Sequence, residues 1–220
     1  MTPSSVSGAV SVIIHEPPAY WEQACLHLSA KDRVMKKLIL AHPKMVLHSR
    51  GDAFTTLARS IVGQQISVKA AQSVWLRFVA LAGELTPANV LGLATGDMRA
   101  SGLSARKVEY LHALATEFSQ GGLGGIEWDR ADDEDIIRQL VAVRGVGRWT
   151  AEMFLIFHLQ RPNVLPLDDV GLVNGISQAY YSGEPVSRSD VRELARAWCP
   201  YATVATWYIW RSLEAAPVMH

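Results

Sequence analysis

The sequence predicts an all-α protein of about ten helices, and three observations lead to that prediction. Apolar residues recur at spacings of three and four, the period of an α-helix, through most of the 220 residues. The periodic segments are bounded by residues that cap helices and by glycine or proline stops. Few runs alternate between apolar and polar residues, and Val10–Ile14 is the one segment that favours a strand.

Each expected helix begins at a residue type that opens helices. Ser, Thr and Asp side chains accept hydrogen bonds from free backbone amides, and proline fits the first helical turn. Acidic residues at the start of 132–143 complement the helix dipole. In chain order, the expected starts are Asp52, Ser67, Thr86–Pro87, Ser104, Asp132, Arg148, Asp168 or Asp169, Ser187 and Tyr201.

Composition restricts the class of protein. Hydrophobic residues make up 49% of the chain and charged residues 19%, which is typical of a globular protein with a sizeable core. The N-terminus has no basic region with a long apolar run, and no stretch approaches the roughly 20 apolar residues of a membrane span. We therefore expect a cytoplasmic protein with no membrane partner. Two cysteines, Cys25 and Cys199, exclude a four-cysteine iron–sulfur cluster, and no side-chain metal site is expected.

Charge gives a mixed indication about nucleic acids. The formal net charge is zero, which argues mildly against a DNA partner, because phosphate neutralisation usually requires a basic excess. Basic residues nevertheless gather over 31–50 and acidic residues over 127–135. A dipolar surface with one basic face fits this distribution, and so does an ordinary solvated mosaic of charges.

The segment 140–172 carries two features that suggest chemistry. Gly145 and Gly147 form a tight turn between two expected helices, where free backbone amides and the helix dipole favour an anion such as a DNA phosphate. An ordinary glycine turn is the alternative. Further on, Asp168 and Asp169 follow a proline-constrained loop and precede an apolar helix. One carboxylate suffices to cap that helix, so the other is available to face a cleft.

Aromatic residues accompany both features. Trp149, Met153 and Phe157 recur at a spacing of four on the helix after the glycine turn. Core packing explains such a stripe, and we prefer that explanation for Phe157. Trp149 lies in the first turn of the helix, beside the glycines, and is expected to line a cavity near the DNA.

Together these residues resemble the helix-hairpin-helix DNA glycosylase superfamily, and most closely its 3-methyladenine DNA glycosylase II branch. The hairpin and the loop aspartate carry the resemblance to the superfamily. Two flanking motifs point to the alkylation branch: residues 59–67, RSIVGQQIS, and the C-terminal WCPY…WYIW over 198–210. The match extends over roughly residues 50–213.

The resemblance implies a two-lobed helical fold with a cleft between the lobes. One lobe would be 51–165, with the helix-hairpin-helix at 132–159, and the other 1–50 plus 166–220. Asp169 would be the catalytic carboxylate and Asp168 the cap or a structural partner. The implied base pocket is formed by Trp149, Trp210, Met153 and Tyr208. The implied DNA contacts are Gln64, Gln65, Ser67, Arg144, Gly145, Val146, Gly147, Arg148 and Thr150, with Gln65 filling the gap left by an extruded nucleotide.

The resemblance also implies an activity. We expect a monomeric enzyme without a cofactor that excises alkylated purines from double-stranded DNA by base flipping. Trp149 stands where lyase-competent relatives carry a lysine, so no Schiff base and no strand cleavage are expected. A monovalent cation on the hairpin backbone near Val143 and Val146 is a further expectation.

Three alternatives stay open from the residues. The chain could be a glycosylase for other damaged bases, although cluster cysteines and the hairpin lysine are missing. A non-catalytic helix-hairpin-helix module would explain the glycine turn, but neither the aspartate pair nor the tryptophan motif. A helical protein with no DNA role is favoured only by the zero net charge.

Overall fold

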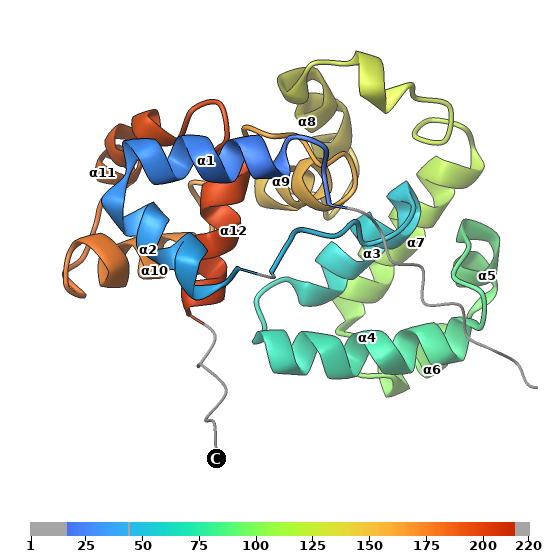
Figure 1. The fold of residues 1–220 in the computed structure, drawn as a ribbon. Helices are drawn as coiled ribbons and strands as arrows, with labels where there is room; N and C mark the ends of the chain where they lie inside the picture. Colours follow the sequence, from blue (N-terminus) through green and yellow to red (C-terminus); the bar gives the residue numbers. More distant parts are fainter. Residues whose placement is uncertain (1–16, 44, 214–220) are drawn as a thin grey trace, which may run out of the picture.

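The computed structural model describes residues 17–43 and 45–213 and is entirely helical within them (Figure 1). These residues form twelve α-helices and two short 3₁₀-helices, and none of them forms a strand. The all-α prediction is confirmed, and the expected number of about ten is slightly low. Val10–Ile14, the suggested strand, lies outside the described residues. No helix in the described ranges combines the length and hydropathy needed to cross a membrane.

The first half of the described chain contains α1 to α7. Their bounds are α1 Trp21–Lys31, α2 Arg33–Ala41, α3 Ala53–Gly63, α4 Val68–Ala82, α5 Pro87–Gly92, α6 Thr95–Ala100 and α7 Ala105–Ser119. The second half continues with η1 Trp128–Arg130, α8 Asp133–Val141, α9 Arg148–Phe157, α10 Val170–Tyr180, α11 Arg188–Leu194, η2 Ala195–Trp198 and α12 Ala202–Ser212.

The helices pack in two groups, seen side by side in Figure 1. In one group α3 contacts α4, α7 and α9, while α5 packs on α7 and α8 on α9. In the other group α12 contacts α1, α2 and α10, and η2 packs on α1 and α11. The chain passes between the groups twice, after α2 and after α9, so two short connections position one group against the other.

Five of the predicted caps explain where their helices begin. Each of these side chains accepts a hydrogen bond from a backbone amide in the first turn, which satisfies a donor that the helix itself leaves free. The carboxylate of Asp190 accepts a hydrogen bond from the backbone amide of Ser187 and completes a capping box. The confirmed caps are Asp52, Ser67, Thr86, Ser104 and Ser187.

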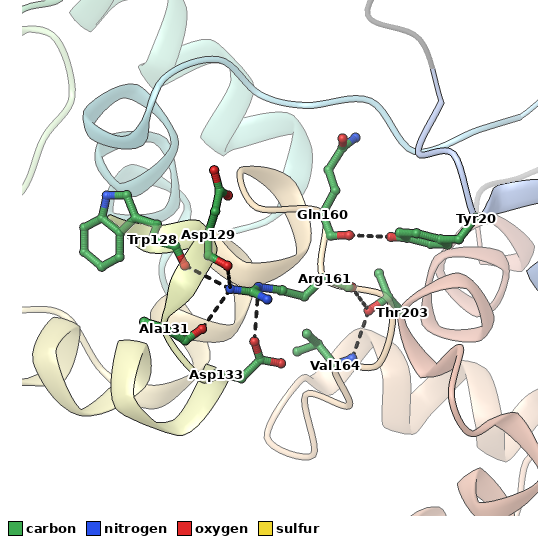
Figure 2. Close-up of polar contacts among 9 residues, drawn as sticks. All are labelled: Tyr20, Trp128, Asp129, Ala131, Asp133, Gln160, Arg161, Val164 and Thr203. Carbon is green, nitrogen blue, oxygen red and sulfur yellow. Dashed lines mark hydrogen bonds and ion pairs between the residues drawn. The ribbon is translucent and has the colours of Figure 1, made fainter. Parts of the chain in front are cut away.

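Arg161 anchors the connection between α9 and α10 (Figure 2). Its guanidinium donates to the carbonyl oxygens of Trp128 and Ala131, both at 2.9 Å, and its Nε lies 3.3 Å from Asp133. The Arg161 carbonyl accepts a 2.6 Å hydrogen bond from the hydroxyl of Thr203 on α12. One residue thus ties the start of α8, the α9–α10 connection and α12 together.

Candidate active site

Asp169 lies where the two groups of helices meet, held by three N–H donors. Its Oδ2 accepts a 2.7 Å hydrogen bond from the indole Nε1 of Trp149 at the start of α9. Its Oδ1 accepts from the indole Nε1 of Trp210 on α12 at 2.8 Å and from the backbone amide of Leu172 at 2.7 Å. All three side chains are partly exposed. Donors from three helices therefore fix the orientation of a carboxylate that solvent can reach.

Two glycines of α10 allow α12, the helix that carries Trp210, to pack closely against α10. A Cβ on Gly171 would lie 3.3 Å from Cδ1 of Trp210, and one on Gly175 would lie 2.4 Å from Cγ2 of Ile209. Larger residues would push α12 away from α10 and lengthen the Trp210–Asp169 hydrogen bond. Sequence reasoning did not single out these glycines, although their spacing of four places them on one helical face.

Of the two roles expected for Asp168, helix cap or structural partner, the cap is wrong. Asp169 itself is the N-cap of α10, since its Oδ1 accepts the Leu172 amide. Asp168 is exposed and forms an ion pair with Arg188, at the start of α11. A carboxylate has two oxygens with about four acceptor positions, so a single side chain can cap a helix and still face a cleft. The sequence prediction gave each carboxylate a single role and did not anticipate that Asp169 fills both.

The glycine turn before α9 has the local geometry of an anion site. Gly145 has a φ of +90°, and a Cβ there would lie 2.1 Å from Cγ of Tyr110, so only glycine fits. Gly147 is the N-cap of α9 and offers no side chain to cover the first amides, which have no acceptor within the helix. The exposed helix start favours a phosphate.

The turn between α3 and α4 faces solvent close to this hairpin. Gln65 is exposed and has a φ of 58°, an uncommon conformation for a residue other than glycine. The preceding Gln64 turns inward, where its Nε2 donates to the carbonyl oxygen of Gly145 at 3.0 Å and to Oγ1 of Thr150 at 2.9 Å. Gln64 thus links the exposed turn to the hairpin and holds Gln65 at the surface.

The chain matches the family model for the HhH-GPD superfamily base excision DNA repair protein over residues 58–201. The match includes the α3–α4 turn, the hairpin and Asp169. The chain belongs to this superfamily.

Relatives within the HhH-GPD superfamily point to one branch. The chain is 31% identical to DNA-3-methyladenine glycosylase 1 of Schizosaccharomyces pombe, over 88% of either chain. It is 32% identical to the DNA-3-methyladenine glycosylase of Saccharomyces cerevisiae, where the match covers 75% of this chain and 61% of the relative. A solved structure of the S. pombe enzyme in complex with abasic DNA has a TM-score of 0.82 at 30% identity, covering 90% of this chain and all of that one.

The structure brings together only part of the base pocket implied by the superfamily resemblance. Trp149 and Trp210 meet at Asp169, but through their N–H edges. Met153 is only 3% exposed and packs in the core. Tyr208 is 2% exposed, and its hydroxyl lies 3.5 Å from the sulfur of Cys25 on α1. The last two side chains are thus buried, and their place in the base pocket stays a prediction.

The implied DNA contacts also divide into exposed and internal groups. Arg144 and Arg148 are exposed, with ion pairs to Glu109 and Glu134. Thr150 and Val146 are buried, and Ser67 is an exposed N-cap. The backbone amides, in contrast to these side chains, stay accessible at Gly147. The expected cation near Val143 and Val146 stays a prediction; the Val143 carbonyl accepts the Val146 amide at 3.0 Å.

A cavity of about 440 Å³ opens between the helix groups, beside the ring pair of Phe157 and Trp210. Phe157 stacks on Trp210, with ring centroids 5.8 Å apart and planes at 13°, and also lines the cavity. Phe157 is 4% exposed and belongs to the hydrophobic core, as the sequence predicts. The other lining residues, which sequence reasoning missed as a group, are His48, Ser49, Arg50, Gly51, Arg59, Trp207 and Arg211.

Glu152 of α9 is a buried acid that lies next to Arg148 of the hairpin and lines a cavity together with Asp168 of the aspartate loop. It is 5% exposed, and its carboxylate accepts from Nε of Arg148 at 3.1 Å. Burial raises the pKa of Glu152 to about 7, against the lowering effect of Arg148. With Asp168 and Arg188 it lines a second cavity of about 200 Å³. Nowhere in the described residues do three His, Cys, Asp or Glu side chains gather as metal ligands.

Proposed function

We propose that this chain is a DNA glycosylase of base excision repair that hydrolyses the N-glycosidic bond of alkylated purines, of the 3-methyladenine and 7-methylguanine type, in duplex DNA. Asp169 is the catalytic carboxylate. The observation that carries the proposal is the carboxylate clamped by Trp149 and Trp210 beside the hairpin. The names of the similar proteins, DNA-3-methyladenine glycosylases from two yeasts, support the substrate class.

The charge of Asp169 suits bond cleavage at a sugar. Breaking the N-glycosidic bond develops positive charge on the sugar, and a fixed carboxylate beside C1′ stabilises that charge without reorganisation. Three of the roughly four acceptor positions of the carboxylate are occupied by N–H donors. The remaining position is enough to orient one attacking water.

The substrate class follows from what the site lacks and what it offers. Alkylated purines carry positive charge and leave readily, so they need little protonation from a general acid. The electron-rich faces of tryptophans attract a cationic ring, by roughly 0.5–2 kcal/mol. The chain has Trp149 and no lysine amine at the start of α9, so the enzyme should release the base by hydrolysis of the N-glycosidic bond without cutting the strand.

DNA binding is assigned to the hairpin and to the α3–α4 turn. The accessible amides at Gly147 hold a backbone phosphate, and Gln65 fills the space of the everted nucleotide and offsets part of the cost of flipping. Val170, which is 71% exposed next to Asp169, adds an apolar contact. We assign residues 51–165 to one lobe and residues 1–50 and 166–220 to the other, and we expect a monomer on double-stranded DNA.

The test is release of free base from duplexes carrying one defined lesion each. We expect release of 3-methyladenine and 7-methylguanine and intact strands afterwards. Borohydride added during the reaction should trap no covalent complex, because no amine attacks the sugar. Release from none of the lesion duplexes would refute the activity, and a trapped complex would refute the hydrolytic mechanism alone.

A further inference from the structure

The cavity between α3, α9 and α12 is lined by three arginines that converge from different segments. Arg50 comes from the α2–α3 connection, which Figure 1 shows crossing from one helix group to the other. Arg59 lies on α3, one turn before the Gln64–Gln65 turn, and Arg211 on α12 directly follows Trp210. Among the described residues, no carboxylate lines the cavity, although the whole chain contains as many acidic as basic residues.

Arg50 and Arg59 are held in place by neutral groups. The guanidinium of Arg50 lies 3.3 Å from the ring centroid of Phe157, and its backbone amide donates to the Phe157 carbonyl. Arg59 donates to Oε1 of Gln72 at 3.0 Å and lies 5.7 Å from the ring centroid of Trp75. Within 17–43 and 45–213, neither of the two arginines forms an ion pair.

This arrangement is costly for the protein alone. Burial, together with repulsion from Arg59 and Arg211, lowers the pKa of Arg50 to about 9. The exposed ion pairs of the described chain, in contrast, each place an arginine beside a carboxylate. An anion bound among the guanidiniums would remove the repulsion, and the planar fork of arginine matches the geometry of a phosphate group.

We propose that Arg50, Arg59 and Arg211 form a binding site for a phosphate group, and that its ligand is a backbone phosphate of the DNA strand that carries the everted nucleotide. The position supports this choice of ligand. Arg59 shares α3 with the exposed Gln65 turn, and Arg211 is adjacent to the tryptophan that holds Asp169. The cavity therefore shares α3 with the proposed wedge and α12 with the tryptophan that holds the proposed catalytic carboxylate, and the identity of the ligand as DNA rests on the proposed function.

The first test uses inorganic phosphate and does not depend on any DNA activity. At equal ionic strength, replacing chloride by phosphate should raise the Tm of the wild type by about 3 °C or more, because a ligand of the folded state stabilises it. Phosphate also stabilises proteins non-specifically, so the comparison is with Arg59→Gln, which should lose most of the rise. Arg196→Gln removes an exposed arginine paired with Glu193 and should keep it. Equal rises in all three proteins would overturn the site.

The second test identifies the source of the phosphate. A duplex with a tetrahydrofuran abasic analogue has the backbone but no base. Arg59→Gln should bind it about 5–10-fold more weakly than the wild type, with the slope of log K against log salt reduced by about 0.9. Arg50→Gln should behave in the same way, provided that it melts cooperatively. Unchanged affinity for this duplex with weakened affinity for a lesion duplex would mean that the arginines contact the base, and the assignment to a backbone phosphate of DNA would fail while the phosphate site stood.

Discussion

At Asp169 one carboxylate serves both the fold and the proposed chemistry. Oδ1 caps α10 through the Leu172 amide, while both oxygens accept indole N–H groups from other helices. Sequence reasoning divided the two roles between Asp168 and Asp169 because it allowed each carboxylate one function. The residue pattern predicted the pair of aspartates and both tryptophans, but which oxygen faces which donor depends on the distance between α9, α10 and α12, which no local pattern encodes.

Trp210→Phe tests whether the indole hydrogen bond positions the carboxylate. Phenylalanine keeps an aromatic ring against Phe157 but removes the donor to Oδ1. We expect base release to slow about tenfold or more, which corresponds to one hydrogen bond to a charged group. Trp128→Phe is the matched control, since Trp128 packs on Phe154 away from the carboxylate, and single-turnover rates should stay within about twofold. Equal rates for wild type and Trp210→Phe would contradict the positioning role.

The hairpin before α9 contains two glycines, and we expect Gly145 to be needed for folding and Gly147 for DNA binding. Gly145 needs its positive φ and its contact with Tyr110, so Gly145→Ala should lower the free energy of unfolding by about 2–4 kcal/mol. At Gly147 an added Cβ meets no atom within 4 Å, so Gly147→Ala should change stability by less than about 0.5 kcal/mol. The same Cβ would cover the amides and weaken DNA binding about tenfold. Urea unfolding and DNA titration of both variants check this; unaltered DNA affinity of Gly147→Ala would remove the hairpin from the interface.

The helix α9 carries a buried acid whose titration should appear in the stability of the fold. The raised pKa of Glu152 means that the folded protein keeps a proton that the unfolded chain releases. Its contribution to stability is therefore greatest below the unfolded pKa of about 4.5 and falls as the pH rises to about 7. Between pH 5 and 8 the wild type should lose on the order of 1–3 kcal/mol more than Glu152→Gln. Parallel curves from urea unfolding would contradict the raised pKa.

The sequence periodicity predicted the individual helices, but it did not predict how the helices pack against one another. Caps at Asp52, Ser67 and Ser187 set helix starts because capping is a local interaction over three residues. The arginine cavity, by contrast, combines residues from 48 to 211, and the repulsion among its arginines exists only after the chain has folded. Met153 and Tyr208 are buried, and spacing alone does not tell how deeply a residue on a helical stripe is covered by its neighbours.

At the scale of the whole molecule, the two helix groups depend on Arg161. Its guanidinium holds the entrance to α8 and its carbonyl holds Thr203 on α12 (Figure 2). Arg161→Met should leave several carbonyl acceptors unpaired and lower the free energy of unfolding by about 2–4 kcal/mol. Arg130→Met, which removes an exposed arginine paired with Glu127, should cost less than about 1 kcal/mol. Similar losses in the two variants would show that the guanidinium of Arg161 adds no more stability than an exposed ion pair.

The proposed activity depends above all on the carboxylate of Asp169. Single-turnover release of 3-methyladenine compares Asp169 directly with its neighbour Asp168. Asp169→Asn keeps a hydrogen-bonding side chain of the same size but removes the charge, so release should slow by on the order of 10²-fold or more while DNA affinity persists. Asp168→Asn removes only the exposed partner of Arg188 and should react within about threefold of the wild type. Release by Asp169→Asn as fast as by Asp168→Asn would contradict the central claim.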